Sequence, residues 1–483
     1  MSKIIEGLEP KSVFEYFEKI NNIPRGSGNE KEISDYLFSF AKDRNLEVVQ
    51  DEHLNIIIKK PATKGYEAYP TVILQGHMDM VCEKNFDVEH DFLKDPIELI
   101  VDGDYISANG TTLGADNGIA VAYCLAILDS DEIEHPAIEV FVTTNEEAGM
   151  NGAIGVDPAN FSAKLLVNLD SEEEGEFLVS CAGGLKACID IPIKYEQVEG
   201  TTVKIMVKGL KGGHSGSDIN MNRANSNRVL GRILYDLNNS MNINLIDIFG
   251  GSKDNAIPRE AYANIIIADN EYDRFNEIVA NISEDIKNEF KTSDSGLIVV
   301  TTKENNSKTK TMANETLSNL IYLLTCLPNG IQTMSSDIEG LVESSLNLGV
   351  VVTNDDSIKL TIAVRSSVGS LKKVMEYQLG LFAKHGHSEF KITGEYPEWE
   401  YRKESKLRDS FTKTYEDMYG EKPLIKAIHA GLECGVFDEK IEGLDMISLG
   451  PNMYDVHTPD EKLSISSTKR TWEFLLNALK NIR

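Results

Sequence analysis

Cysteine is scarce in this chain, and no two cysteines have the spacing of a CxxC pair. The 483 residues include six cysteines, at Cys82, Cys124, Cys181, Cys188, Cys326 and Cys434. Such a sparse set fits reduced thiols in a cytoplasm and supplies no thiolate cluster for a metal. Thiol catalysis through Cys181 or Cys434 is disfavoured, because neither residue lies in a recognisable nucleophile and base pattern.

Long apolar runs and an excess of basic residues are also absent. No stretch reaches the about 18 apolar residues of a membrane span, and the N-terminal segment MSKIIEGLEPKSVFEYFEKI lacks the apolar core of a signal peptide. The 48 Lys and Arg residues are outnumbered by 77 Asp and Glu residues, which gives a net charge of −29. This balance argues against a broad surface for nucleic acid or anionic lipid. We therefore expect a cytoplasmic protein that binds neither nucleic acid nor membranes.

Short β-rich runs alternate with helical patterns from residue 1 to about 186, as in an α/β layer fold. Apolar residues after Asn117 recur with helical spacing, and a final amphipathic helix includes Trp472. Buried strands are expected at residues 71–74, 137–144, 165–169 and 446–449. These patterns predict an α/β domain made of residues 1–186 and 396–483, with the C-terminal segment packed onto the first block.

The intervening residues 187–395 have a different pattern, which predicts an inserted α+β domain. It consists of two similar β-α-β-β-α halves, at about 187–292 and 293–395, without obvious sequence identity between them. In the first half we expect strands at 203–207, 243–249 and 263–268 and helices at 222–237 and 272–290. In the second half we expect strands at 297–300, 347–352 and 359–364 and helices at 311–327 and 370–385. Hinges are expected near 186–190 and 390–400.

Five acidic or histidine clusters follow the predicted strands or lie in the loops beside them. They are Gln75–Asp79, Gly114–Gly118, Asn145–Gly149, Asn168–Glu172 and Tyr454–Thr458. Open α/β sheets bind ligands at the carboxyl ends of their strands, so we expect these clusters to meet. Two histidines and three carboxylates brought together suit a pair of divalent ions, such as zinc, cobalt or manganese.

Two short spacings within these clusters suit metal chemistry. His77 and Asp79 lie on one face of an extended segment, so that one can bind a metal while the other orients the imidazole ring. In a loop, one of Glu146 and Glu147 can bind a metal while its neighbour acts as the base for a metal-activated water. Each cluster alone has an ordinary structural alternative, such as a polar pair, a solvated surface or a turn. The combination favours a metal centre.

The strings GHMD, GADNG, EEAGMNGA, NLDSEEEGE and HTPDE occur in this order. They resemble those of the dinuclear zinc peptidase family that contains the carnosinases, the tripeptidases of the peptidase T type and the aminoacylases, which is metallopeptidase family twenty. Three longer strings, NLDSEEEGEFLVSCAGG, GLKGGHSGSDINMNRAN and HAGLECG, are most similar to the branch of cytosolic non-specific dipeptidases, also called aminoacyl-histidine dipeptidases. The resemblance covers nearly the whole chain and implies a zinc-peptidase-like fold, in which residues 1–186 and 396–483 form the α/β catalytic, metal-binding domain and residues 187–395 form an inserted α+β lid domain.

The resemblance implies two bound divalent ions, with zinc as the first choice and cobalt or manganese as alternatives. Its five ligands are Asp116 as the bridge, His77 and Asp170 at one ion, and Glu147 and His457 at the other. The resemblance further implies that Asp79 orients His77 and that Glu146 is the general base. It also implies a cis peptide bond between Asp116 and Asn117.

The same resemblance implies that three residues of the predicted lid contact the substrate. His214 in GGHSG is implied to stabilise the oxyanion, and Arg365 in AVRSS to bind the substrate's C-terminal carboxylate. Asn255 in DNAIPRE is implied to contact the substrate. A turn residue is the alternative for His214 and for Asn255. His429 and Glu433 in HAGLECG match a pocket loop of the family and receive no role.

Together these implications predict a dinuclear-metal hydrolase that cleaves unblocked dipeptides, with broad specificity that includes Xaa-His such as β-alanyl-histidine. One alternative is another activity of the same family, such as tripeptide cleavage or deacylation of N-acyl amino acids. Another is a non-catalytic peptide-binding protein on the same fold, although such a protein would be free to lose Glu146 or a ligand. The expected partners are small peptides, and the chain is expected to be a monomer or a homodimer. Because the predicted lid is doubled, we hypothesise that its second half replaces the lid of a partner chain.

Overall fold

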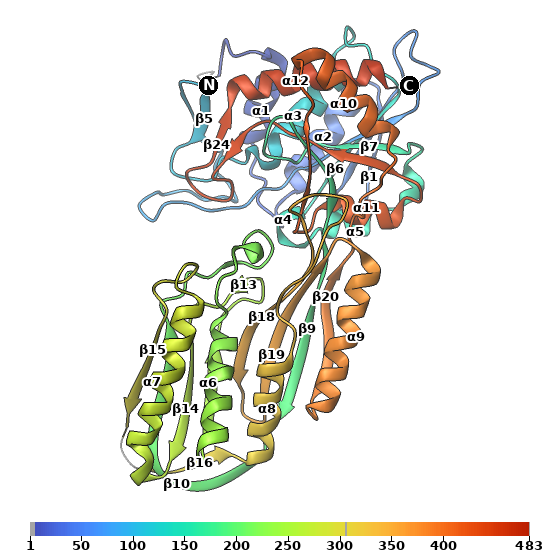
Figure 1. Cartoon of the computed structure of the whole chain (residues 1–483). Helices are drawn as coiled ribbons and strands as arrows, with labels where there is room; N and C mark the ends of the chain where they lie inside the picture. The colour runs from blue at the N-terminus through green and yellow to red at the C-terminus, as the bar shows by residue number, and fades with distance from the viewer. Residues whose placement is uncertain (1–4, 305–306, 483) are drawn as a thin grey trace. The chain divides into compact units, whose positions relative to one another are not determined.

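The computed structural model describes residues 5–304 and 307–482. The chain divides into two compact units (Figure 1). The first unit contains Met1–Ser180, Tyr401–Ala427 and Leu432–Arg483, and the second contains Cys181–Glu400 and Ile428–Gly431.

The first unit is built on an eight-stranded sheet with buried parallel strands at its centre. Its strands are β1 (Glu47–Gln50), β2 (Ile56–Lys60), β3 (Val72–His77), β6 (Ile138–Thr143), β7 (Leu165–Asn168), β8 (Glu176–Cys181), β21 (Leu424–Ile428) and β22 (Asp445–Ser448). Their order is β1-β2-β6-β3-β7-β22-β8-β21. The β3 strand pairs in parallel with β6 and β7, and β22 continues the parallel set beside β7. Every residue of β3 and β6 is buried, as expected where both faces of a parallel sheet are covered.

Helices and a smaller sheet complete the first unit. The helices are α1 (Lys11–Asn21), α2 (Lys31–Asp43), α3 (Ala115–Asp129), α4 (Glu146–Gly149), α5 (Asn151–Gly155), α10 (Lys406–Tyr419), α11 (Glu433–Lys440) and α12 (Ile465–Asn481). The smaller sheet has the order β23 (Met453–Tyr454), β24 (Lys462–Ser464), β5 (Tyr105–Ala108) and β4 (Leu99–Asp102). The Trp472 ring of α12 stacks on the Tyr123 ring of α3 at 5.7 Å. The prediction that the C-terminal segment packs onto the N-terminal block is therefore confirmed.

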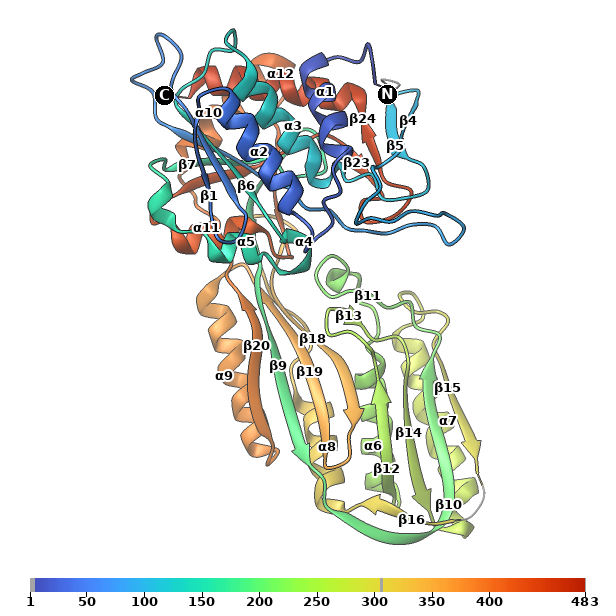
Figure 2. The same cartoon turned by 180° about the vertical axis from the view of Figure 1, so that it is seen from behind.

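The second unit is a ten-stranded antiparallel sheet with helices on one face (Figures 1 and 2). Its strands are β9 (Gly183–Pro192), β10 (Tyr195–Lys208), β12 (Asn244–Gly250), β14 (Ala261–Ile267), β15 (Ile298–Lys303), β16 (Ser307–Met312), β17 (Gly330–Met334), β18 (Val342–Thr353), β19 (Ser357–Ser366) and β20 (Glu389–Tyr396). The helices are α6 (Ser226–Ser240), α7 (Tyr272–Glu289), α8 (Asn314–Cys326) and α9 (Gly369–His385), and a separate pair of short strands is β11 (Gly213–His214) with β13 (Ala256–Ile257). Alternate strand residues and the apolar faces of the four helices form one core, because successive strand side chains point to opposite faces.

The two halves of the second unit do not contain the strands that were expected in them. The order β15-β10-β14-β12-β18-β19-β9-β20 places residues 298–303 beside β10, in the first half. The strand predicted to open the second half is therefore wrongly assigned. Its position beside β19 is taken by β9, which precedes the first half in the chain. Each half then reads strand, helix, two strands, helix and edge strand, and the second half depends on long-range pairing that local patterns do not encode.

Two helices of the second unit begin later in the chain than predicted. The helix expected from residue 222 begins at Ser226, because the Asn225 side chain accepts hydrogen bonds from the N–H groups of Asn227 and Arg228. The helix expected from Thr311 begins at Asn314, because Thr311 pairs within β16 against β10.

The division between the units lies outside the first predicted hinge. Residues 186–190 belong to β9 and pair with β19 on one side and β20 on the other, so the boundary between the units precedes the segment in which a hinge was expected. The chain changes unit after Ser180 and again after Glu400, whereas the sequence placed the changes after residues 186 and 395. The assignment of catalytic and lid roles to the two units stays a prediction. Across the described ranges 5–304 and 307–482, no helix combines the length and the apolar character needed to cross a bilayer.

Candidate functional site

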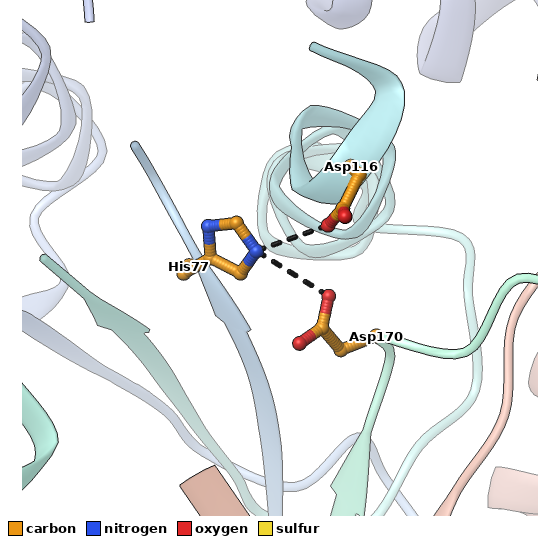
Figure 3. A group of neighbouring side chains, drawn as sticks. All are labelled: His77, Asp116 and Asp170. Carbon is orange, nitrogen blue, oxygen red and sulfur yellow. Dashed lines mark hydrogen bonds and ion pairs between the residues drawn. The ribbon is translucent and has the colours of Figure 1, made fainter. Parts of the chain in front are cut away.

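The first group of candidate ligands meets at the carboxyl end of the parallel strands. His77 is the last residue of β3, and Asp170 lies two residues after β7 ends. The Nε2 atom of His77 lies 3.0 Å from Oδ1 of Asp116 and 3.4 Å from Oδ1 of Asp170 (Figure 3). Because β3 and β7 are parallel neighbours, their ends place these side chains at one edge of the sheet.

The second group meets on the other side of the same aspartate. The Nε2 atom of His457 lies 3.1 Å from Oδ2 of Asp116 and 2.9 Å from Oε1 of Glu147. His457 follows β23 and has a φ of +64°. Asp116 therefore presents one oxygen to each histidine. The peptide bond between Asp116 and Asn117 is cis, as the resemblance implied.

The donor set fits divalent cations. Three triads have one ligand atom from each residue within 4.8 Å of the others: His77 with Asp116 and Asp170, His77 with Glu146 and Glu147, and Asp116 with Glu147 and His457. Imidazole nitrogen and carboxylate oxygen are good ligands for zinc and comparable ions. Four carboxylates against two imidazoles leave an excess of negative charge that a dication neutralises. The structure therefore brings all five predicted metal ligands together.

Asp79 contacts His77 and also the backbone of Glu146 and Glu147. Its backbone oxygen lies 3.1 Å from Nδ1 of His77, and its Oδ1 lies 3.4 Å from the same nitrogen. The side chain also accepts hydrogen bonds from the backbone N–H groups of Glu146 at 3.1 Å and Glu147 at 3.3 Å and from the Ser27 hydroxyl at 2.7 Å. The contact with His77 was expected, whereas the contacts with the two glutamates were missed, since only the fold brings residue 79 beside residue 146.

The segment containing Glu146 and Glu147 was expected to be a loop, and this is wrong. The two residues open the four-residue helix α4 after Asn145, which has a φ of +56°. Asp79 accepts the first N–H groups of this helix and so acts as a cap contributed by a distant strand end.

Charges within the cluster shift the pKa values of its members. Although burial opposes the charged form, Asp170, Asp116 and Asp79 hold the pKa of His77 well above its usual range. Hydrogen bonds to Asp116 and Glu147 raise the pKa of His457 to about 11. The ring nitrogens thus carry protons that a cation bound between the same atoms would replace. Burial raises the pKa of Glu146, and the neighbouring charges of Asp170 and Glu433 add to this rise.

The three predicted substrate residues all lie in the second unit. Arg365, near the end of β19, is 8% exposed and donates from Nη1 to the Tyr396 hydroxyl at 2.9 Å. Its Nη2 atom lies 3.4 Å from Nε2 of His214. Residues from the two halves of the unit therefore meet within one chain. Tyr396 was missed by the sequence analysis, because no local signal links it to Arg365.

The loop after His214 determines which ring nitrogen carries the proton. The Nδ1 atom accepts hydrogen bonds from the N–H groups of Gly216 and Ser217, both at 3.3 Å. Because Nδ1 accepts, the proton of the neutral ring lies on Nε2, which can donate; the 3.4 Å contact between Nε2 and Nη2 of Arg365 then joins two donors and is not a hydrogen bond. Burial and the positive charge of Arg365 lower the pKa of His214, which favours the neutral ring.

Asn255 lies close to His214 in the chain fold. It precedes β13, which pairs with β11, and its backbone oxygen accepts a hydrogen bond from Ser215 N–H at 2.8 Å. A pocket of about 260 Å³ in the second unit is lined in part by Asn255, Arg365 and Tyr396. Both predicted substrate-binding residues, Asn255 and Arg365, therefore line the same pocket.

The two residues without a predicted role lie in different units. Glu433 belongs to the first unit and accepts hydrogen bonds from Gln75 at 2.6 Å and Thr143 at 2.8 Å, while burial raises its pKa to about 7. His429 belongs to the second unit, where its Nε2 lies 2.7 Å from the Ser345 hydroxyl.

His429 is expected to stay neutral through mildly acidic pH. Burial, followed by the charge of Arg365, lowers its pKa to about 3. The unfolded chain takes up this proton below about pH 6.5, so between pH 6.5 and 3 the free energy of unfolding falls by about 1.4 kcal/mol per pH unit from this group. The measurement is an NMR titration of histidines labelled with ¹³C at Cε1, with the signal assigned by its loss in His429→Gln. A folded-state midpoint near the unfolded value would contradict the expectation.

The comparisons with known proteins agree with this geometry. The chain is 39% identical over 477 residues, with 98% of each chain covered, to the Cytosol non-specific dipeptidase of Escherichia coli (strain K12). The crystal structure of Aminoacylhistidine Dipeptidase from Vibrio alginolyticus matches with a TM-score of 0.93 at 38% identity, over 99% of this chain and 98% of that chain. Aminopeptidase PepT from Bacillus cereus ATCC 10987 shares the fold, with a TM-score of 0.58 at 16% identity over 98% of this chain and 99% of that chain.

The family assignment rests on most of the chain. Residues 73–481 match the profile of Peptidase family M20/M25/M40. This range includes every candidate metal ligand and agrees with the resemblance drawn from the sequence motifs. The chain therefore belongs to Peptidase family M20/M25/M40.

Proposed function

We propose that this protein is a metal-dependent dipeptidase that hydrolyses unblocked dipeptides, including Xaa-His such as β-alanyl-histidine. One observation carries the proposal: Asp116 presents one oxygen to His77 and the other to His457, and Glu146 lies in the same cluster. This is the arrangement of a two-ion site with a base beside it. The relatives from Escherichia coli and Vibrio alginolyticus, both named as dipeptidases, support this substrate class.

The metal ligands would hold two divalent ions, for which we propose zinc, with cobalt or manganese as alternatives. His77 and Asp170 would hold one ion, Glu147 and His457 would hold the other, and Asp116 would contribute an oxygen to each. Bound there, the ions lower the pKa of a water molecule and polarise the scissile carbonyl.

The remaining steps belong to side chains of the protein. The Glu146 carboxylate accepts the proton of the attacking water and then delivers it to the leaving amine. Asp79 accepts hydrogen bonds from the N–H groups of Glu146 and Glu147, and this contact orients the Glu146 carboxylate. His214 donates from Nε2 to the developing oxyanion, a role that requires the neutral ring with its proton on Nε2.

Arg365 binds the C-terminal carboxylate of the dipeptide, and Asn255 contacts the substrate beside it. The guanidinium of Arg365 is nearly buried, and Tyr396 fixes one of its Nη atoms. A fixed fork of donors recognises a carboxylate bidentately. The proposed partners are therefore small peptides, and the name of the Escherichia coli relative supports a cytoplasmic location.

The direct test measures the release of free amino acids by metal-stripped protein reloaded with zinc or manganese. The substrates are β-alanyl-histidine and other dipeptides, a tripeptide and an N-acetyl amino acid. Cleavage that depends on metal and is confined to unblocked dipeptides is the expected result. Cleavage of the tripeptide or the acetylated substrate would instead assign another activity of the family. If no substrate of the panel is cleaved although the protein has bound two metal ions, the result would favour a non-catalytic peptide-binding protein.

Replacing Arg365 by alanine is expected to lower kcat/KM for dipeptides by about 10- to 100-fold, mainly through KM, because a hydrogen bond to a charged group contributes about 1.5–3 kcal/mol. The matched substrate is the same dipeptide with a C-terminal amide. The wild type should prefer the acid strongly, and Arg365→Ala should lose most of that preference. Arg365→Lys keeps the charge without the fork and should be intermediate. An unchanged ratio of acid to amide in Arg365→Ala would remove this residue from carboxylate recognition.

A further inference from the structure

A buried glutamate outside the ligand set holds the segment that carries Asp116. Glu461 is 2% exposed and lies four residues after His457. Its Oε2 accepts hydrogen bonds from the N–H groups of Leu113 at 2.7 Å and Gly114 at 2.9 Å. Its Oε1 accepts from Ala115 at 2.8 Å and from Asp116 at 3.3 Å. These groups lie at the start of α3, where N–H groups have no partner within the helix, so one side chain satisfies all four.

A buried arginine holds the same segment from its other side. Arg25 is 2% exposed and donates from Nη2 to the backbone oxygen of Gly114 at 2.5 Å. Its Nη1 donates to the backbone oxygens of Met78 at 3.0 Å and Asp79 at 3.2 Å, directly after His77. Gly114 thus gives its N–H to Glu461 and its oxygen to Arg25. The two charges link the segments that contain His77, Asp116 and His457.

Two glycines of the GADNG motif leave room for this arrangement. A Cβ atom on Gly114 would lie 2.4 Å from Nη2 of Arg25, and a Cβ atom on Gly118 would lie 2.7 Å from the same atom. Gly114 also has a φ of +69°, which favours glycine. The guanidinium therefore occupies the space that side chains at these positions would fill. This packing explains why positions 114 and 118 of the motif are both glycine.

We propose that Arg25 and Glu461 are positioning residues that set the spacing between His77, Asp116 and His457 and thereby the affinity of the protein for divalent cations. The inference deepens the proposed function and rests on it. Glu461 fixes the His457 loop to the Asp116 segment, and Arg25 fixes the end of β3 to the same segment. Burial lowers the pKa of the Arg25 guanidinium to about 10, and the negative charge of Glu461 is the largest of the influences that oppose this lowering.

A purely structural role would have a different signature. If the two residues only stabilised the fold, their replacement would lower the unfolding temperature of the metal-free protein and leave metal affinity unchanged in the protein that remains folded. Positioning residues instead change metal affinity, because the ligands must be held at the distances that the ion requires. Metal affinity is therefore the deciding quantity, and it does not depend on any assay of catalysis.

The experiment measures zinc binding to metal-free full-length protein by competition with a chromophoric chelator, and records the absorption spectrum of the protein loaded with cobalt. The variants are Glu461→Gln, which keeps the volume and removes the charge, and Arg25→Lys, which keeps the charge and removes the fork. Asp460→Asn is the matched control, because it removes the adjacent acid of the same motif at an exposed position. We expect the two test variants to bind zinc about 10- to 100-fold more weakly, with a changed cobalt spectrum. The control should match the wild type.

The possible outcomes separate this inference from the proposed function. Two zinc ions bound with wild-type affinity by Glu461→Gln and Arg25→Lys would overturn the inference and leave the proposed function intact. Failure of the wild type itself to bind two ions would overturn both. If Glu461→Gln does not fold, Glu461→Asp replaces it, since this variant keeps the charge and withdraws the carboxylate by one carbon. Normal affinity in Glu461→Asp and Arg25→Lys would then overturn the inference, and weakened affinity would support it.

Discussion

Replacing Glu146 by glutamine is expected to lower kcat for dipeptide hydrolysis by about 10²- to 10⁴-fold, the range of a lost general base. Glutamine has nearly the same shape and keeps the backbone N–H that donates to Asp79 at 3.1 Å. The change therefore removes proton transfer and leaves the turn in place. In the wild type, burial raises the pKa of the Glu146 carboxyl group. A raised pKa suits a residue that takes a proton from water and returns it to an amine. The measurement is steady-state kinetics on β-alanyl-histidine.

The control for this variant is its metal content. Glu146→Gln should bind two ions with the affinity of the wild type, since the proposed ligand of this pair is Glu147. Glu173→Gln provides a matched change of an exposed glutamate and should leave kcat unchanged. Near wild-type turnover by Glu146→Gln would show that another group accepts the proton. A loss of both turnover and metal would instead identify Glu146 as a ligand.

Replacing Asp116 by alanine is expected to abolish the binding of both metal ions and with it all measurable hydrolysis. Its two oxygens face His77 at 3.0 Å and His457 at 3.1 Å, so one side chain serves both ion positions. Without bound metal, the pKa of water returns from about 7 towards its value of about 15.7, and the nucleophile is lost at neutral pH. The measurements are metal content after dialysis against buffered zinc and activity on the same dipeptide.

The position of Asp116 between the two histidines predicts that different ligand variants lose different numbers of metal ions. Asp170→Ala should retain the ion bound by Glu147 and His457, because Asp170 contacts only His77 of the two histidines. Asp157→Ala is the matched control, since this aspartate is exposed and caps a short 3-10 turn away from the cluster. Two ions in Asp116→Ala, or an equal loss in Asp116→Ala and Asp170→Ala, would contradict the bridging position.

Much of the first unit could be predicted from local sequence patterns. Buried runs such as residues 71–74 and 137–144 fall within or around β3 and β6, because strands covered on both faces need continuous apolar residues. The second unit was less predictable, although most of its helices and strands were expected near their observed positions. Residues 298–303 form a strand as expected, yet they pair with β10 and not with the second half. Strand propensity is local, whereas the choice of a pairing partner is a property of the whole sheet.

The sequence by itself identified the family, and it predicted the five metal ligands and the groups suited to acid and base chemistry. The family and the ligand roles followed from the resemblance of short motifs, and the position of several of these motifs after parallel strands predicted that they would meet at one end of the sheet. Only the tertiary structure decided which oxygen of Asp116 faces which histidine, that Asp79 also caps the helix beginning at Glu146, and that Tyr396 holds Arg365. It alone placed Arg25 and Glu461 on either side of Gly114. These contacts join segments as far apart as 89 and 347 residues, and no local pattern specifies a hydrogen bond across such a distance.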